Sequence, residues 1–148
     1  MKYLYTKAFL GGALISIVPA FIVTLLSSII PRVQSENLEV VNDIFSVETY
    51  GILQYFMLFS IIVLSPVIEE VIFRGVLWNF MKRFLKEKTV YIVISVIFAA
   101  IHVDLLHVLG LLPVSFLLGW FKYKTGNIKA SLVCHISNNL VACIIMMV

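Results

Sequence analysis

The sequence predicts an all-α membrane protein: a polytopic bundle of about five transmembrane helices that forms a single domain over residues 1–148. Composition is the first observation behind this prediction, because 61% of the 148 residues are hydrophobic and the mean hydropathy is +1.07. Soluble domains contain roughly 45–50% apolar residues. The second observation is that several apolar runs approach or exceed the ~20 residues that a helix needs to cross a bilayer. The lipid bilayer is therefore an expected partner of this chain.

Two long apolar runs open the chain. Residues 9–30 are expected to form a retained first span, because the run is longer than the roughly 7–15 apolar residues of a signal peptide. Pro19 should kink this span. After a polar connection at residues 31–49, residues 50–81 form a second span that is longer than a bilayer requires. We expect this span to tilt, to project from the membrane or to bend at Pro66.

Three shorter spans complete the predicted bundle, at residues 90–102, 108–121 and 128–148. Gly126 is the expected stop of the fourth helix, and Asn127 is the expected N-cap of the fifth. Cys134 and Cys143 both fall in the last span, nine residues apart, which is too far for a disulfide between them on one helix. We expect two buried and unreactive thiols.

Charge alternates between the predicted loops. Lys2 and Lys7 precede the first span, residues 31–49 are net acidic, and the connections at residues 82–88 and 122–129 are basic. Because basic loops stay in the cytoplasm, the pattern places the N-terminus there and, with five spans, the C-terminus outside.

The formal net charge of +3 is spread over these short loops. No continuous basic face results, so no nucleic-acid partner is expected. The sequence shows no organelle signal, which favours the plasma membrane of a bacterium as the location of a multi-pass protein.

Three charged residues interrupt the second span: Glu69, Glu70 and Arg74. An ionised side chain near a bilayer centre costs roughly 2.5–3.5 kcal/mol, so these charges need partners inside a bundle. Glu70 and Arg74 are spaced i, i+4 and can pair on one helix face. Glu69 lies about 100° round the helix and is left over. The pair would then hold Glu69 in position for catalysis. The alternative is a structural cluster of polar side chains that only holds helices together.

Further polar residues occur on the third and fifth spans. Phe98 and His102 form an FxxxH pattern, and His135 and Asn139 form HxxxN with both side chains on one helix face. At 1.5 Å per residue, Glu69 and His102 each lie about 20 Å from the nearest cytoplasmic loop. Helix tilt can therefore bring all of these groups to a shared depth. A histidine on an apolar helix can equally be a hydrogen-bonded core residue.

These residue types suit hydrolysis of a peptide bond inside a membrane. Glu69 and a neutral His102 can orient and deprotonate a water molecule, while His135 and the Asn139 amide can donate to the oxyanion on the scissile carbonyl. A metal is the competing chemical account, because one glutamate and two histidines can hold Zn²⁺ with an open water position. The HExxH spacing of soluble zinc proteases is absent, so no cofactor is assigned.

The ordered motifs resemble a known family of intramembrane endopeptidases, the CAAX protease and bacteriocin-processing family. The resemblance covers about residues 64–142 and includes the approach to the last motif at residues 119–135. It is carried by EExxxR (Glu69, Glu70, Arg74), FxxxH (Phe98, His102) and HxxxN (His135, Asn139).

The resemblance implies a proteolytic helical bundle. Glu69 and His102 would activate water, His135 and Asn139 would stabilise the oxyanion, and a metal-free, glutamate-dependent account suits it better than a zinc site. Relatives often have six to eight spans, so a homo-oligomer could complete a five-span bundle.

Three functions are compatible with these residues. The leading hypothesis is a peptidase that cuts a small peptide, a leader sequence or a membrane-anchored protein. The second is a non-catalytic membrane protein that confers immunity to a peptide or binds it, with the polar cluster only structural. A proton-coupled carrier is the third, and it is disfavoured because the first and fourth spans supply no ionisable residue to continue a pathway.

Overall fold

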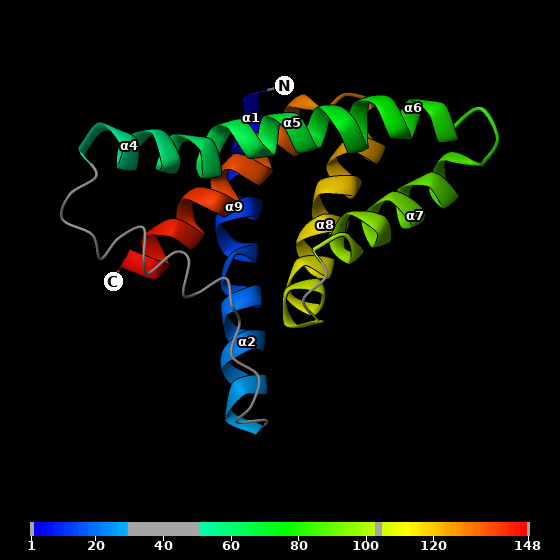
Figure 1. Cartoon of the computed structure of the whole chain (residues 1–148). Helices are drawn as coiled ribbons and strands as arrows, with labels where there is room; N and C mark the ends of the chain where they lie inside the picture. The colour runs from blue at the N-terminus through cyan, green and yellow to red at the C-terminus, as the bar shows by residue number, and fades with distance from the viewer. Residues whose placement is uncertain (1, 30–50, 103–104, 148) are drawn as a thin grey trace.

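Every regular element in the described part of the chain is a helix. The computed structural model describes residues 2–29, 51–102 and 105–147, and no strand occurs among them, which confirms the predicted all-α class (Figure 1). Two elements, η1 and η2, are π-helical turns, in which an N–H bonds the carbonyl five residues earlier. In chain order the elements are α1 (Lys2–Ile15), α2 (Ile17–Ile29), α4 (Gly51–Phe59), η1 (Ser60–Leu64), α5 (Ser65–Glu70), η2 (Val71–Leu77), α6 (Trp78–Met81), α7 (Glu87–Ala100), α8 (Leu105–Thr125) and α9 (Lys129–Met147).

The first predicted span is one helical column made of α1 and α2 (Figure 1). The column begins at Lys2 rather than at residue 9, because no helix breaker precedes the apolar run. Its helical pattern is interrupted at Ser16, whose hydroxyl donates to the Ala13 carbonyl at 2.7 Å. The ring of Pro19 crowds the carbonyl of Ile15, four residues earlier, which explains an interruption at this point.

The second predicted span is a single helix of 31 residues, Gly51–Met81, and it crosses the α1–α2 column (Figure 1). At 1.5 Å per residue it is about 46 Å long, against about 30 Å for the hydrocarbon core of a bilayer. The expected disturbance at Pro66 takes the form of the π-turn η1, which ends directly before the N-terminal turn of α5. A second π-turn, η2, follows the two glutamates.

The remaining three helices agree with the predicted spans to within a few residues. Gly126 ends α8 with φ of +72°, a conformation that side chains with a Cβ rarely adopt. Asn127 lies one residue before the N-cap position, because the Ile128 carbonyl accepts the first intrahelical bond of α9, from the Leu132 N–H. The Asn127 side chain still satisfies the first N–H of the helix, since its Oδ1 accepts from the N–H of Lys129 at 3.0 Å. α8 is longer than predicted and carries Pro113 inside it.

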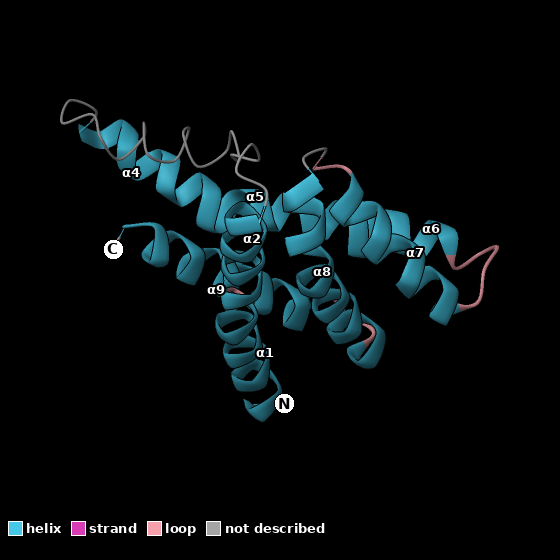
Figure 2. Cartoon of the chain, turned by 90° about the horizontal axis from the view of Figure 1, so that it is seen from below, coloured by secondary structure: helices cyan, strands magenta, loops and turns pink. Residues whose placement is uncertain are grey.

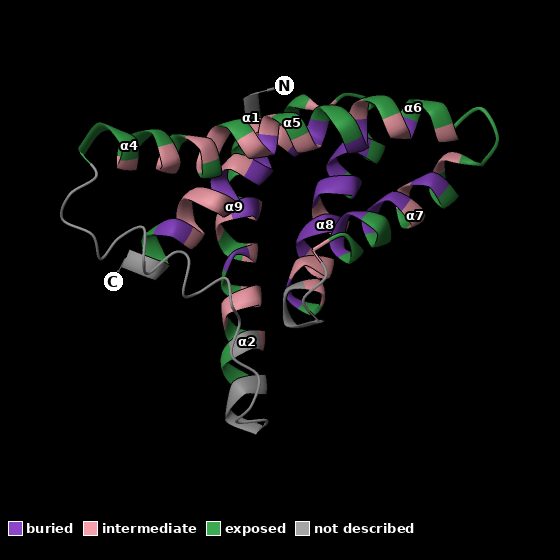
Figure 3. Ribbon diagram, in the orientation of Figure 1, coloured by how far each residue is buried: buried purple, intermediate pink, exposed green. Residues whose placement is uncertain are grey.

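Buried side chains gather where the helices meet, whereas α4 has no buried residue and is made of exposed and half-buried ones (Figure 3). One apolar cluster joins α1, α8 and α9 and consists of Ala8, Val114, Leu118, Phe121, Ala130 and Cys134. A second cluster joins the end of the long helix to α7 and consists of Phe73, Trp78, Val90, Ile94 and Phe98. Cys134 and Cys143 are free and buried, as predicted.

Glycines allow the closest helix contacts. A Cβ on Gly12 of α1 would lie 2.0 Å from the carbonyl oxygen of Cys134 in α9, and one on Gly119 of α8 would lie 2.6 Å from Oγ of Ser95 in α7. Small residues let helix backbones approach in this way in membrane proteins. Figure 2 shows the same α1–α9 and α7–α8 neighbours from below.

Among the described residues, two helices are long and apolar enough to cross a membrane, Tyr3–Ile22 and Gly51–Met81. Lys129–Ile145 is a shorter apolar helix. The five-span count and the cytoplasmic N-terminus therefore stay predictions. The polar connection at residues 31–49 lies wholly outside the described residues.

Candidate active site

Glu70 and Arg74 form the buried centre of the polar site. Arg74 Nη1 donates to Glu70 Oε1 at 2.9 Å, and neither side chain is exposed, so the predicted i, i+4 ion pair is confirmed. Arg74 reaches across to α8, where its Nη2 donates to the Ser115 hydroxyl at 3.0 Å and to the Ser115 carbonyl at 3.2 Å. A buried ion pair is tolerated when further hydrogen bonds satisfy its remaining atoms, and Ser115 supplies two of these.

Helix α9 completes the surroundings of Glu70. The Ser131 hydroxyl donates to Glu70 Oε2, and His135 Nδ1 lies 3.1 Å from Glu70 Oε1. Because an ionised carboxylate can only accept, the proton of a neutral His135 is on Nδ1. Glu70 therefore joins α5 to α9 through two side chains and to η2 through the arginine.

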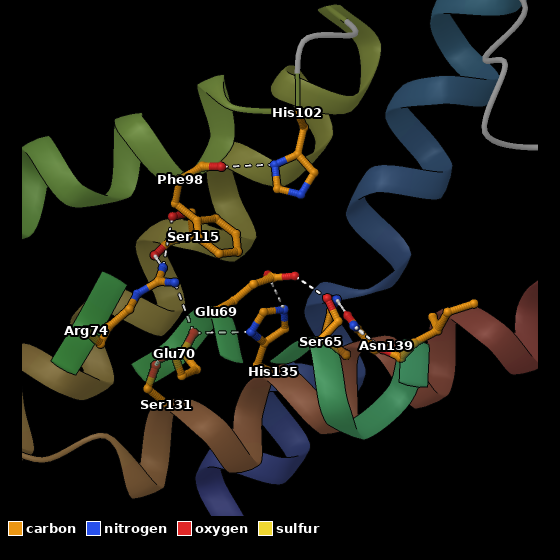
Figure 4. A network of polar contacts seen from close by, with 12 residues as sticks. Ser65, Glu69, Glu70, Arg74, Phe98, His102, Ser115, Ser131, His135 and Asn139 are labelled. Atoms are coloured by element: carbon orange, nitrogen blue, oxygen red, sulfur yellow. Dashed lines mark hydrogen bonds and ion pairs between the residues drawn. The ribbon is translucent and has the colours of Figure 1, made fainter. Parts of the chain in front are cut away.

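Glu69 lies beside this centre in a different environment. Its side chain is 26% exposed, and its Oε1 accepts a hydrogen bond of 2.5 Å from the Ser65 hydroxyl one turn earlier. Its Oε2 faces His135 Nε2 at 3.7 Å (Figure 4). Glu69 therefore has an orienting hydroxyl on one oxygen and an imidazole near the other, with part of its surface open.

His102 lies just after α7, near the same cluster. Its Nδ1 is 3.0 Å from the Phe98 carbonyl, which can only accept, so Nδ1 carries the proton and Nε2 of the neutral ring keeps its lone pair. The Phe98 ring separates the two histidines, with centroid distances of 5.5 Å to His102 and 5.7 Å to His135. The same ring lies 4.3 Å from the Arg74 guanidinium carbon. Among the described residues, no direct hydrogen bond or ion pair joins His102 to Glu69.

Asn139 lies one turn after His135 on α9. Its Nδ2 donates to the backbone carbonyl of Ile61, inside the π-turn η1, at 3.0 Å. Its Oδ1 accepts from Nδ2 of Asn138 at 3.1 Å. The amide predicted to stabilise an oxyanion is thus bonded to the backbone of the glutamate-bearing helix.

A family model described as type II CAAX prenyl endopeptidase Rce1-like matches residues 51–141 of this chain. The match covers more than half of the sequence and includes all six predicted site residues. The chain belongs to this Rce1-like family. No curated protein and no solved structure matches the chain significantly. This match confirms the family resemblance expected from the motifs. Proteins of this Rce1-like family are generally proteases and are membrane proteins.

The structure of this Rce1-like chain brings four of the six predicted residues into one contact network: Glu69, Glu70, Arg74 and His135. His102 borders the network through the Phe98 ring, and Asn139 borders it through the π-turn. Sequence reasoning did not predict four serines that lie in or beside the network: Ser65, Ser95, Ser115 and Ser131. Ser65 and Ser131 each lie four residues before a site residue, so helical spacing could have indicated them. Ser95 and Ser115 reach the arginine region by packing of α7 on α8, which no sequence spacing shows.

A metal site is not formed by the residues that the Rce1-like family motifs supply. Among the described residues, no group of three or more His, Cys, Asp or Glu side chains is arranged to hold a metal ion. Glu69 and His135 approach each other, but the second histidine of the predicted ligand set is not grouped with them. We therefore derive no step that runs through a metal.

Proposed function

We propose that this chain is an intramembrane endopeptidase in which Glu69 activates the attacking water. The observation that carries the proposal is the contrast between two adjacent carboxylates. Glu70 accepts from Arg74, Ser131 and His135 and has no exposed surface. Glu69 is held by one hydroxyl and keeps an open side, which is what a general base needs if water is to reach it.

His102 is the proposed second group on the water. Its Nδ1–H is used by the Phe98 carbonyl, which leaves Nε2 as an acceptor for a proton. A water held between Glu69 and His102 would give up one proton as its oxygen attacks the scissile carbonyl. That proton would then pass to the leaving amine, so acid and base roles balance over one turnover.

His135 is the proposed donor to the oxyanion, whereas the Asn139 amide, one turn later on α9, donates to the Ile61 carbonyl. Since Glu70 occupies Nδ1, His135 can donate from Nε2 only as an imidazolium. The Oε2 atom of Glu69 lies 3.7 Å from this nitrogen, on the side of the ring that faces the proposed water. A preorganised donor of this kind stabilises the developing negative charge in a site with little water.

The family description names a CAAX prenyl endopeptidase, and for this chain we propose the broader class of small peptides, leader sequences or membrane-anchored proteins as substrates. Cleavage would occur in a bacterial plasma membrane, nearer its cytoplasmic face. No cofactor is assigned, and a homo-oligomer could complete the bundle around the substrate. Cleavage that survives exhaustive chelation of divalent metals would support the metal-free account.

The test compares new peptide termini in membranes of cells that carry wild-type protein or Glu69→Gln at matched abundance. We expect a small set of termini to vanish in the variant, because loss of the general base should slow hydrolysis by about 100-fold or more. Glu87→Gln, a change outside the site, is the control and should keep these termini. Identical profiles for wild type and Glu69→Gln, with the cellular phenotype retained, would instead support a binding or immunity protein.

A further inference from the structure

The π-turn η1 redirects the backbone N–H that the carbonyl of Ile61 would bond in a regular α-helix. In a regular α-helix the carbonyl of Ile61 would accept from the N–H of Ser65. In this structure the Ser65 N–H donates to the Ser60 carbonyl, five residues earlier. The next residue in line for Ile61 is Pro66, which has no N–H. The Ile61 carbonyl therefore needs a donor from elsewhere, since an unpaired carbonyl inside a membrane costs several kcal/mol.

The donor is a side chain from the other end of the chain. Asn139 Nδ2 lies 3.0 Å from the Ile61 oxygen and donates to it. The bond depends on two residues far apart in the sequence. Pro66 lacks the N–H that would bond the Ile61 carbonyl in a π-turn, and Asn139 lies at the position on α9 from which its amide reaches that carbonyl. His135, one turn before Asn139, contacts both glutamates, so α9 binds the long helix on each side of Pro66.

We propose that Asn139 is a positioning residue for Glu69, acting through the π-turn. Ile61 lies one turn before Ser65, and Ser65 lies one turn before Glu69 and donates to its carboxylate. Fixing the Ile61 carbonyl fixes the helical register at Ser65, and with it the direction of the Glu69 side chain. This catalytic consequence rests on the proposed function, whereas the bond itself is a property of the fold.

The chemistry of the contact supplies a specific rescue. Pro66→Ala restores an N–H at position 66. If the π-turn is kept, that N–H can bond the Ile61 carbonyl, and if the helix reverts to α-helical register, the Ser65 N–H can do so. Either way the carbonyl gains a backbone donor, and the Asn139 amide is no longer needed there.

The experiment is a double-variant cycle of Asn139→Leu and Pro66→Ala in purified protein in lipid nanodiscs and in cell membranes. Asn139→Leu should lower the thermal unfolding midpoint by about 2–6 °C, the effect of about one lost hydrogen bond. It should also reduce the yield of Glu69-dependent peptide termini by about 10- to 100-fold, as expected for a misplaced catalytic group. The double variant Asn139→Leu/Pro66→Ala should then resemble the single variant Pro66→Ala. We expect the yield of termini to agree within about twofold and the unfolding midpoint within about 1 °C, because the backbone N–H replaces most of the lost bond.

The control is Pro113→Ala, which removes a proline from inside α8. It should leave the loss caused by Asn139→Leu unchanged. An equal thermal loss from Asn139→Leu with and without Pro66→Ala would overturn the proposal. Restored stability without restored cleavage would overturn the positioning role while leaving the proposed peptidase intact. If wild-type protein yields no Glu69-dependent termini, the proposed function fails, and the thermal cycle still tests the bond to Ile61.

Discussion

Glu69 and Glu70 are adjacent on one helix but lie in different environments. Glu70 points into the junction with α8 and α9, where Arg74 pairs with its charge and Ser131 and His135 donate hydrogen bonds to it. Glu69, about 100° round the helix, is bonded by Ser65 and stays 26% exposed. The surroundings of Glu70 stabilise its charge and keep it from reacting, whereas the Glu69 carboxylate stays available to a water molecule.

The buried pair leads to a prediction about stability. Arg74→Met should lower the free energy of unfolding by about 3–5 kcal/mol, because it leaves the Glu70 charge buried and unpaired. The double variant Glu70→Gln/Arg74→Met should cost less than the sum of the two single variants. Thermal unfolding in detergent measures these differences. Lys82→Met, in the exposed Lys82–Glu87 pair, is the control and should cost under about 1 kcal/mol. Strictly additive losses at Glu70 and Arg74 would contradict a coupled pair.

The two histidines should separate catalysis from stability. His135→Ala removes a buried ring that bonds Glu70 and packs on Phe98, so it should lower both the yield of Glu69-dependent termini and the unfolding midpoint. His102→Ala removes a part-buried ring whose hydrogen bond is to a carbonyl of its own helix, so it should lower the yield by about 100-fold with little thermal effect. Equal destabilisation by both variants would favour a structural role for His102.

At the scale of elements, the connection from α6 to α7 is held by an ion pair. Lys82 Nζ donates to Glu87 Oε1 at 2.8 Å, and the Trp78 indole N–H lies 3.4 Å from the same oxygen. The hydrogen bond from Lys82 is the main cause that lowers the pKa of Glu87 below its ordinary value of 4.5, against the opposing effect of burial. The carboxylate form is therefore the one that stabilises this junction.

The lowered pKa of Glu87 predicts a pH dependence. Because the pKa is lower in the folded state, the stabilisation is present above the ordinary value of 4.5 and is lost as the pH falls through the lowered value. Wild type should exceed Glu87→Gln in unfolding free energy at pH 7, by under about 1 kcal/mol since the pair is exposed. Unfolding curves from pH 7 to pH 3 should show the two proteins converging at the acidic end. A difference that grows on acidification would contradict this sign.

At the scale of the whole molecule, the close contact of α1 with α9 places the first helix against the site-bearing one. Gly12→Ala should force these helices apart, because the new Cβ would lie 2.0 Å from a backbone oxygen. We expect a loss of about 1–3 kcal/mol or more in unfolding free energy. The neighbouring Gly11→Ala is a matched control, since its Cβ would make ordinary contacts starting at 3.5 Å with a Leu117 side chain. It should be neutral or stabilising in the same thermal measurement. Equal losses for the two variants would argue against the α1–α9 contact.

Membrane orientation belongs to the same scale. The N-terminus, the α6–α7 connection and the α8–α9 turn lie toward one side of the molecule (Figure 1). These are the segments whose positive charge predicts a cytoplasmic location. A reporter that is active only in the cytoplasm should therefore be active at the N-terminus and inactive at the C-terminus. Activity at both ends would require an even number of spans.

The sequence by itself determined the helical class, the ion pair of Glu70 with Arg74, the helix stop at Gly126 and the role of the Asn127 side chain at the start of α9. Each of these depends on residues within about one helical turn of each other, so spacing along the chain is enough to predict it. The order of three motifs was also enough to indicate the family.

Only the tertiary structure decided which groups meet across helices. It joined Glu70 to Ser131 and His135, brought Ser115 to the arginine, and gave the Asn139 amide to a carbonyl of the long helix. It also showed that Pro66 acts through a π-turn. These outcomes depend on crossing angles and helix rotation, which are set by close contacts such as Gly12 on Cys134, and a sequence carries no local signal for them.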